Sequence, residues 1–162
     1  MPVMSEPATC AQALQAFLAQ HLPLTEAMGV RVVEASDDRI EVAVPLEPNL
    51  NHEQTAFGGS ISTLGILAGW GWFWTQLRHH DPLPRLLIGH SSTRYIRPVE
   101  GPFSAVCHHP GQRPLQQFVE TFAATGKARL ALRSEIRFND KIAAVHDGIF
   151  VAMKPTTKGG QA

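Results

Sequence analysis

The pattern of hydrophobic and polar positions divides the chain into one long uncharged stretch and several shorter alternating ones. The uncharged stretch, AFGGSISTLGILAGWGWFWTQL, runs from Ala56 to Leu77 and contains all three tryptophans. It opens with two glycines and a group of hydroxyl side chains, and it ends in large aromatic residues. Because it is apolar on almost every side, it predicts a helix that is enclosed all round rather than one lying on a surface.

Two environments can enclose such a helix: a lipid bilayer, or a β-sheet wrapped around it. An uncharged run of about 18 residues or more is long enough to span a membrane. This run, however, holds five glycines and several Ser, Thr and Gln residues, and its flanks show no excess of Lys or Arg. The neighbouring segments also alternate like strands of a soluble sheet. We therefore predict a buried helix and no membrane span.

Alternating segments predict strands on both sides of this helix. Residues 30–35 and 39–46 predict a hairpin, and four further strands are expected at 85–99, 103–108, 127–138 and 142–153. In residues 127–138 the charged side chains share one face and the apolar ones the other, as in a sheet with one wet face. In the last strand Asp147 and Gly148 interrupt the pattern. There we favour a bulge, with Gly148 in an unusual backbone conformation, over a second hairpin.

Three further segments read as helix or turn. Residues 5–21 predict an amphipathic helix with Ser5 as its cap and Pro7 in its first turn, and residues 25–28 predict a short turn. Residues 115–124 fit a helix or a strand; their spacing favours a helix ended by Gly126. Helices kept apart from sequential antiparallel strands define the α+β class. We expect one domain over residues 1–155 and a frayed tail over 156–162.

The composition mainly excludes classes of partner and cofactor. Fourteen basic and fourteen acidic residues cancel, and the pI is near 7.1, so nothing favours a nucleic acid or an anionic membrane as partner. The two cysteines, Cys10 and Cys107, lack metal-binding spacing, and neighbouring histidines such as His79 and His80 point apart, so we expect no metal. Reduced thiols and the lack of a signal peptide predict a cytoplasmic location.

Four blocks of the sequence carry a resemblance to a known family. In order they are Asn49-Leu50-Asn51, Thr55 to Ile61, Gly69-Trp70-Gly71 and Arg94 to Val99. From about Pro23 to Pro155 the chain resembles the thioesterase-like domain at the C-terminus of YiiD-type proteins. The resemblance implies the hot-dog fold, a curved antiparallel sheet wrapped around a long central helix. It also implies a homodimer or dimer of dimers that acts on an acyl thioester of coenzyme A or acyl carrier protein. Coenzyme A then enters as part of the substrate, and no separate cofactor is expected.

The resemblance implies an active site at the start of the central helix, between subunits. Unpaired N–H groups and the positive end of the helix dipole lie there. They can polarise a thioester carbonyl and stabilise the oxyanion that forms when water attacks it. Gly58, Gly59 and Ser60 would supply these donors. The residues expected to contact substrate are Thr55, Phe57, Gly58, Gly59, Ser62 and Tyr95.

The chain departs from many hot-dog thioesterases at two places. They have His-Gly-Gly where this chain has Phe57-Gly58-Gly59, and they carry an acid about two turns into the helix, where this chain has Ile66. A hydrolase with this sequence therefore needs a base from outside the central helix, either in the same chain or in another subunit. The candidates are His52 and Glu53 on the loop and His90 on the long strand. Asn51 could orient the water or the carbonyl, and Thr55, Ser60 or Ser62 could hold the water. The expected catalytic set is Asn51, Glu53, Ser60 and His90.

Each of these residues also has a plain structural interpretation. The glycine pair suits a tight turn without any ligand, and Asn51 suits a loop cap. His52 and Glu53 suit a solvated loop, and His90 an ordinary strand position. The charged row from Lys127 to Arg137 is either a solvated face or a contact for the phosphates of coenzyme A. The missing helix acid keeps a second function open, a non-catalytic acyl-CoA-binding or assembly module of the same fold.

Overall fold

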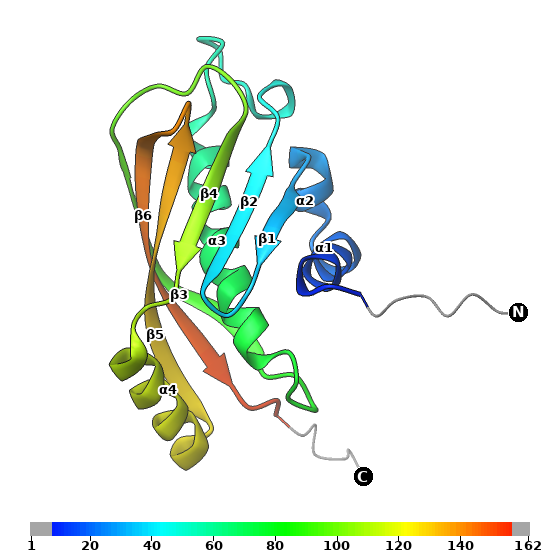
Figure 1. Ribbon diagram of the computed structural model, residues 1–162, viewed down its shortest axis with the longest axis vertical. Helices are drawn as coiled ribbons and strands as arrows, with labels where there is room; N and C mark the ends of the chain where they lie inside the picture. Colours follow the sequence, from blue (N-terminus) through cyan, green and yellow to red (C-terminus); the bar gives the residue numbers. More distant parts are fainter. Residues whose placement is uncertain (1–7, 157–162) are drawn as a thin grey trace, which may run out of the picture.

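Six antiparallel strands form one curved sheet around a long helix in the computed structural model, which describes residues 8–156 (Figure 1). The strand order is β1-β2-β4-β5-β6-β3. The strands are β1 Arg31–Ala35, β2 Arg39–Val44, β3 Arg85–Tyr95, β4 Phe103–His108, β5 Lys127–Phe138 and β6 Lys141–Met153. The helices are α1 Cys10–His21, α2 Pro23–Met28, α3 Gly58–Leu77 and α4 Gln112–Thr125, with a 3₁₀ turn η1 at Glu47–Asn49. The predicted α+β class, with a curved sheet around one long helix, is confirmed.

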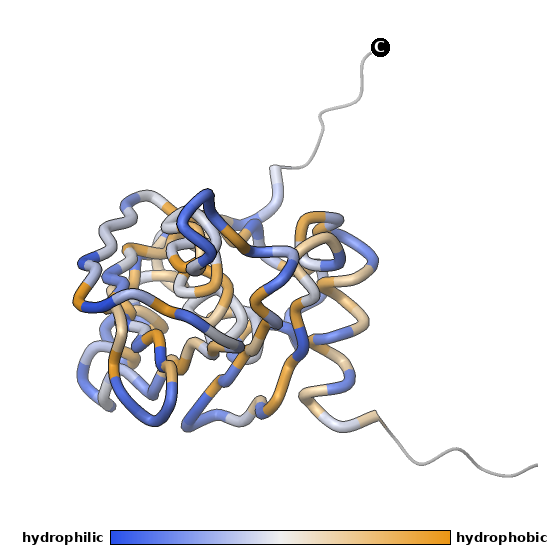
Figure 2. The backbone as a smooth tube through the Cα atoms, turned by 90° about the horizontal axis from the view of Figure 1, so that it is seen from above, coloured by the Kyte–Doolittle hydropathy of each residue, from blue (hydrophilic) through white to orange (hydrophobic). Residues whose placement is uncertain are grey.

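Helix α3 forms the centre of the hydrophobic core, within the bounds that the uncharged stretch predicts. Trp72 and Phe73 have no solvent exposure, and strands β2 to β6 all pack against the helix. Burial alternates along β2 and most of β5, as a sheet with one buried face requires, and hydrophobic and hydrophilic stretches follow one another along the backbone (Figure 2). Within the described residues, no helix is long and apolar enough to cross a membrane.

Glycines in α3 let the strands approach the helix backbone closely. A Cβ atom at Gly65 would lie 2.6 Å from Cβ of His146, and one at Gly69 would lie 2.6 Å from Cζ of Phe150. Both distances are far below ordinary carbon–carbon contact. The small residues of α3 therefore make room for large side chains of β6.

We expect Gly65→Ala to lower the free energy of unfolding by about 1–3 kcal/mol. The new methyl group would overlap Cβ of His146, an atom that cannot move away unless the backbone of β6 moves too. The matched control is Gly71→Ala, whose methyl group would lie 3.1 Å from the flexible end of Leu14. Alanine is favoured over glycine in a helix by about 1 kcal/mol, so the control should stay within that amount of wild type. Urea unfolding of both variants measures the difference, and equal losses would contradict it.

The first helix begins later than predicted. Ser5 and Pro7 lie outside the described residues, and α1 starts at Cys10. Thr9 Oγ1 accepts the N–H of Gln12 at 3.2 Å, while Gln12 Oε1 accepts the N–H of Thr9 at 2.8 Å. This reciprocal pair is a capping box, which fixes the start of a helix more strongly than a lone serine.

The segment predicted as a short turn at residues 25–28 is instead part of a helix. Pro23 takes the first helical position of α2, where its missing N–H has no cost, and Gly29 ends the helix at φ 72°. The predicted helix near residues 115–124 is confirmed as α4. It ends at Gly126, also at φ 72°. The tail residues 157–162 lie outside the described part of the chain.

The predicted bulge at Asp147 and Gly148 of β6 is wrong. The strand continues without a break past Asp147 and Gly148, which pair with Arg133 and Leu132 of β5. Gly148, which we expected in an unusual backbone conformation, has no positive φ. Its small size has another cause, since a Cβ there would lie 2.6 Å from Cε2 of Phe150. The pairing shifts elsewhere: between β5 and β6 at Ile136 and Arg137, where the register skips Ala143 of β6, and on the neighbouring strand β3 between Ile88 and His90.

This shift changes which side chains of β3 face the core. Strict alternation places Leu86, His90 and Ser92 on one side, but the extra residue at Gly89 reverses the pattern beyond it. Ser91 and Thr93 pair with Gly148 and His146, which are buried, so both face α3. The strand ends at Tyr95, earlier than predicted. It forms one edge of the sheet and is exposed along most of its length.

Candidate functional site

Helix α3 begins with three backbone N–H groups that have no acceptor within the described residues. They belong to Gly58, Gly59 and Ser60, and the preceding Phe57 makes no side-chain cap. The loop before the helix is anchored by the N–H of Phe57, which donates to the carbonyl of Asn49 at 2.7 Å. The helix start is thus a fixed group of donors at the positive end of the helix dipole.

The edge strand β3 holds the first two turns of α3 by side-chain hydrogen bonds. Tyr95 Oη donates to the carbonyl of Gly58 at 2.8 Å, and Thr93 Oγ1 donates to Ser62 Oγ at 3.1 Å. The Tyr95 ring also lies over Gly58, where a Cβ would sit 3.4 Å from Oη. The structure therefore brings together three of the predicted substrate contacts: Gly58, Ser62 and Tyr95. Phe57, another of them, is 56% exposed beside the same turn.

The loop residue Asn51 uses its side chain within the loop itself. Asn51 Oδ1 accepts the N–H groups of Glu53 at 2.8 Å and Thr55 at 3.1 Å, and Nδ2 donates to Thr55 Oγ1 at 2.9 Å. This arrangement shapes a polar turn. Glu53 and its neighbour His52 pair at 3.1 Å, with side chains 73% and 87% exposed. Within one chain these two predicted bases face solvent.

His90 lies on the other face of the sheet. It pairs with Ile149 of β6, an exposed residue between the buried Gly148 and Phe150. Directly paired residues of antiparallel strands share a face, so the His90 side chain points away from α3. The structure thus separates His90 from the helix start of its own chain.

A histidine that the sequence analysis missed lies on the inner face. His146 of β6 is fully buried, and its Nε2 lies 2.8 Å from Ser91 Oγ. Its Nδ1 has no hydrogen-bond partner within the described residues. Strict alternation through β6 would have placed His146 on the inner face, but the assumed bulge at the next two residues hid this signal.

The pKa of His146 is lowered mainly by burial, which disfavours the charged imidazolium. Asp147, next along the strand, opposes this effect, and His90 adds to it. In the unfolded chain the imidazole takes up a proton once the pH falls below the ordinary histidine pKa of about 6.5, whereas in the folded chain it does so only at lower pH. The neutral imidazole therefore contributes its full share of the folding stability above about pH 6.5, and this share is lost as the pH falls toward the lower pKa of the folded chain.

We expect the loss of folding stability on acidification to be smaller in His146→Gln than in wild type. Urea unfolding of wild type, of this variant and of the control His52→Gln at about pH 8 and about pH 5.5 brackets the titration. The control should lose stability on acidification as wild type does, because His52 is exposed. Equal losses in wild type and His146→Gln would contradict the expectation.

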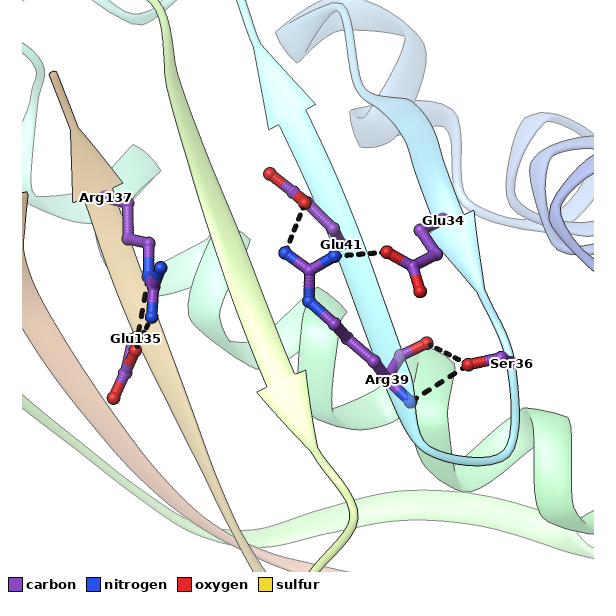
Figure 3. A network of polar contacts seen from close by, with 6 residues as sticks. All are labelled: Glu34, Ser36, Arg39, Glu41, Glu135 and Arg137. Atoms are coloured by element: carbon purple, nitrogen blue, oxygen red, sulfur yellow. Dashed lines mark hydrogen bonds and ion pairs between the residues drawn. The ribbon is translucent and has the colours of Figure 1, made fainter. Parts of the chain in front are cut away.

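The outer face of the sheet carries charged side chains that pair with one another. Arg39 of β2 bonds to Glu34 and Glu41, and Arg137 of β5 bonds to Glu135 (Figure 3). A hollow of about 590 Å³, lined in part by Arg39 and Arg137, lies beside this network. It is on the face opposite α3. Arg133 is likewise held by Asp147 at 2.7 Å. These pairings fit a solvated face better than a binding row for phosphates.

An antiparallel sheet curled around one long helix is the architecture of the hot-dog class of proteins. Residues 11–154 match the family described as "Putative thioesterase (yiiD_Cterm)", and the chain belongs to that family.

Solved structures share this fold. A protein of unknown function from Chlorobaculum tepidum is 29% identical, with a TM-score of 0.84 over 90% of this chain and 94% of that one. The putative thioesterase from Shewanella oneidensis is 27% identical, with a TM-score of 0.75 over 89% and 97%. A probable thioesterase from Pseudomonas aeruginosa shares the fold at 16% identity, with a TM-score of 0.77 over 91% and 97%.

Proposed function

We propose that this protein hydrolyses an acyl thioester of coenzyme A or acyl carrier protein, with the oxyanion held at the start of α3. The observation that carries the proposal is the group of three unpaired N–H donors at Gly58, Gly59 and Ser60. The two glycines leave the backbone open to a close approach by the carbonyl. Fixed donors of this kind contribute a large share of the catalysis in acyl transfer.

The other predicted residues take roles that follow from their contacts. Phe57 and Tyr95 flank the helix start and would border the acyl group, and Ser62 would hold water one turn on. Asn51 would act indirectly, by shaping the loop together with Thr55. Glu53 is exposed on its loop, and we propose that it acts at the site of a second copy.

We propose further that the protein works as a homodimer or a dimer of dimers, joined through β3. This edge strand has eleven residues, and no strand pairs with its outer side in the described chain. Exposed hydrophobic side chains lie on and beside it: Leu87, Ile88, Tyr95 and Ile96. A long, unprotected edge of this kind is a template for pairing with another strand. Light scattering on the purified protein should give two or four times the 17.7 kDa chain mass; a monomer would contradict the proposal.

A thiol-release assay over a panel of acyl-CoA and acyl-carrier-protein substrates tests the function. We expect turnover of some member of the panel. The second candidate, a non-catalytic acyl-CoA-binding module, is favoured by the lack of any acid in α3; it predicts tight binding with no release above background. We also propose a cytoplasmic location, which two free cysteines fit.

A further inference from the structure

We propose that Ser91 and His146 supply the nucleophile and the general base that α3 lacks. The proposal rests on the thioesterase function proposed above. Ser91 Oγ and His146 Nε2 lie 2.8 Å apart, which is the contact that an activated serine requires. The serine is on the exposed edge strand and the imidazole is buried. A substrate at the edge would therefore meet the hydroxyl, with the base behind it.

Two glycines form a cradle for the imidazole. A Cβ at Gly65 would lie 2.6 Å from His146 Cβ, and one at Gly148 would lie 3.0 Å from its Cε1. The imidazole thus lies against α3, a helix that carries no acid of its own. Both neighbouring elements are shaped to admit it.

Other titratable groups around His146 are less suited to act as the base. Burial raises the pKa of Cys107 to about 12, so this thiol stays protonated at neutral pH. His90 faces the outer side, as does Asp147, which is paired with Arg133. Burial lowers the pKa of His146, so its imidazole is neutral before the reaction and has a ring nitrogen free to accept the serine proton. Ser134 of β5 pairs directly with His146 in the sheet, but neither Ser134 Oγ nor His146 Nδ1 has a hydrogen-bond partner within the described residues.

Ser91 and the helix start that holds the oxyanion would come from different copies. Within one chain Ser91 is four residues from Tyr95, about 13 Å along an extended strand, which is too far for one carbonyl to contact both ends. If two β3 strands pair antiparallel about Thr93, Ser91 of one copy lies opposite Tyr95 of the other. Since Tyr95 bonds to Gly58, the donors at the start of that α3 come to the serine.

The reaction runs in two balanced steps. First, Ser91 Oγ bonds to the thioester carbonyl carbon while its proton passes to His146 Nε2. The C–S bond then breaks, the thiol leaves with that proton, and the acyl group remains on Ser91 as an ester. In the second step water attacks the ester and gives a proton to His146; the bond to Ser91 breaks and Oγ recovers the proton. Thioester and water become carboxylic acid and thiol.

Substitution of Ser91 by alanine tests the proposal, with Ser92→Ala as the matched control. Ser92 pairs with Asp147 and faces the outer side. We expect Ser91→Ala to lower kcat by a factor of about 10³ or more and Ser92→Ala to leave it unchanged. Mass spectrometry of rapidly quenched wild type, with peptide mapping, should find an acyl group on Ser91. Thermal melts of both variants check folding.

The outcomes separate this proposal from the hydrolase function. A Ser91→Ala variant with wild-type turnover would overturn the catalytic pair and leave the thioesterase intact. A lower rate without any acyl group on Ser91 would overturn the covalent step. A wild-type protein with no turnover of any substrate would overturn both.

A mixed dimer tests the sharing of the site. A heterodimer of a Gly58→Pro chain and a Ser91→Ala chain keeps one complete composite site, so about half of the wild-type rate should return. No recovery would contradict the shared site.

Discussion

Replacing Gly58 with proline is expected to lower the rate of thioester hydrolysis by a factor of about 10²–10³, because it removes one N–H donor from the proposed oxyanion site. The fold should tolerate the change. Proline is favoured at the first position of a helix, and the preceding Phe57 has φ −63° and ψ 133°, the extended conformation that a residue before proline prefers. Steady-state thiol release measures the effect.

The matched control is Gly58→Ala, which keeps the N–H group. Its methyl group would lie 3.4 Å from Tyr95 Oη, which is an ordinary contact. We expect this variant to retain most of the wild-type rate. Loss of activity in both variants would point to crowding by a side chain, and retention in both would remove Gly58 from the oxyanion site.

Truncating the core of α3 should have the largest effect on stability. Trp72 is fully buried, and its Nε1 donates to the carbonyl of Asp37 at 2.8 Å. We expect Trp72→Ala to lower the free energy of unfolding by about 3–5 kcal/mol, through the cavity it leaves. Trp70→Ala is the control, since Trp70 is only half-buried against Phe17 and should cost less. Urea unfolding compares them, and an equal cost would contradict the central place of Trp72.

The sequence allowed the main elements to be predicted because their signals are local. An uncharged run marks α3, and alternation over residues 127–138 marks β5 with the bounds that the structure has. The start of α2 was missed because Pro23 serves equally well to stop one helix and to begin another. Both roles of Pro23 fit the residues next to it, and only its distance along the sequence from Gly29, which ends α2, indicates that a helix begins there.

The candidate site was only partly predictable, because its geometry depends on strand pairing. Gly58, Ser62 and Tyr95 lie together in the structure, but it was the family resemblance, and not the residue pattern, that grouped them in one site. The orientation of His90 depends on one extra residue in β3, and the contact of Ser91 with His146 depends on the register of that strand against β6. Long-range register has no local signal, so this pair became visible only in three dimensions.

A crystal structure of the protein with a coenzyme A thioester analogue, in which a methylene group replaces the sulfur, would show where the carbonyl binds. We expect the carbonyl oxygen to lie about 2.7–3.1 Å from backbone nitrogens at Gly58 to Ser60. A carbonyl bound elsewhere, for example in the hollow beside Arg39 on the outer face, would contradict it.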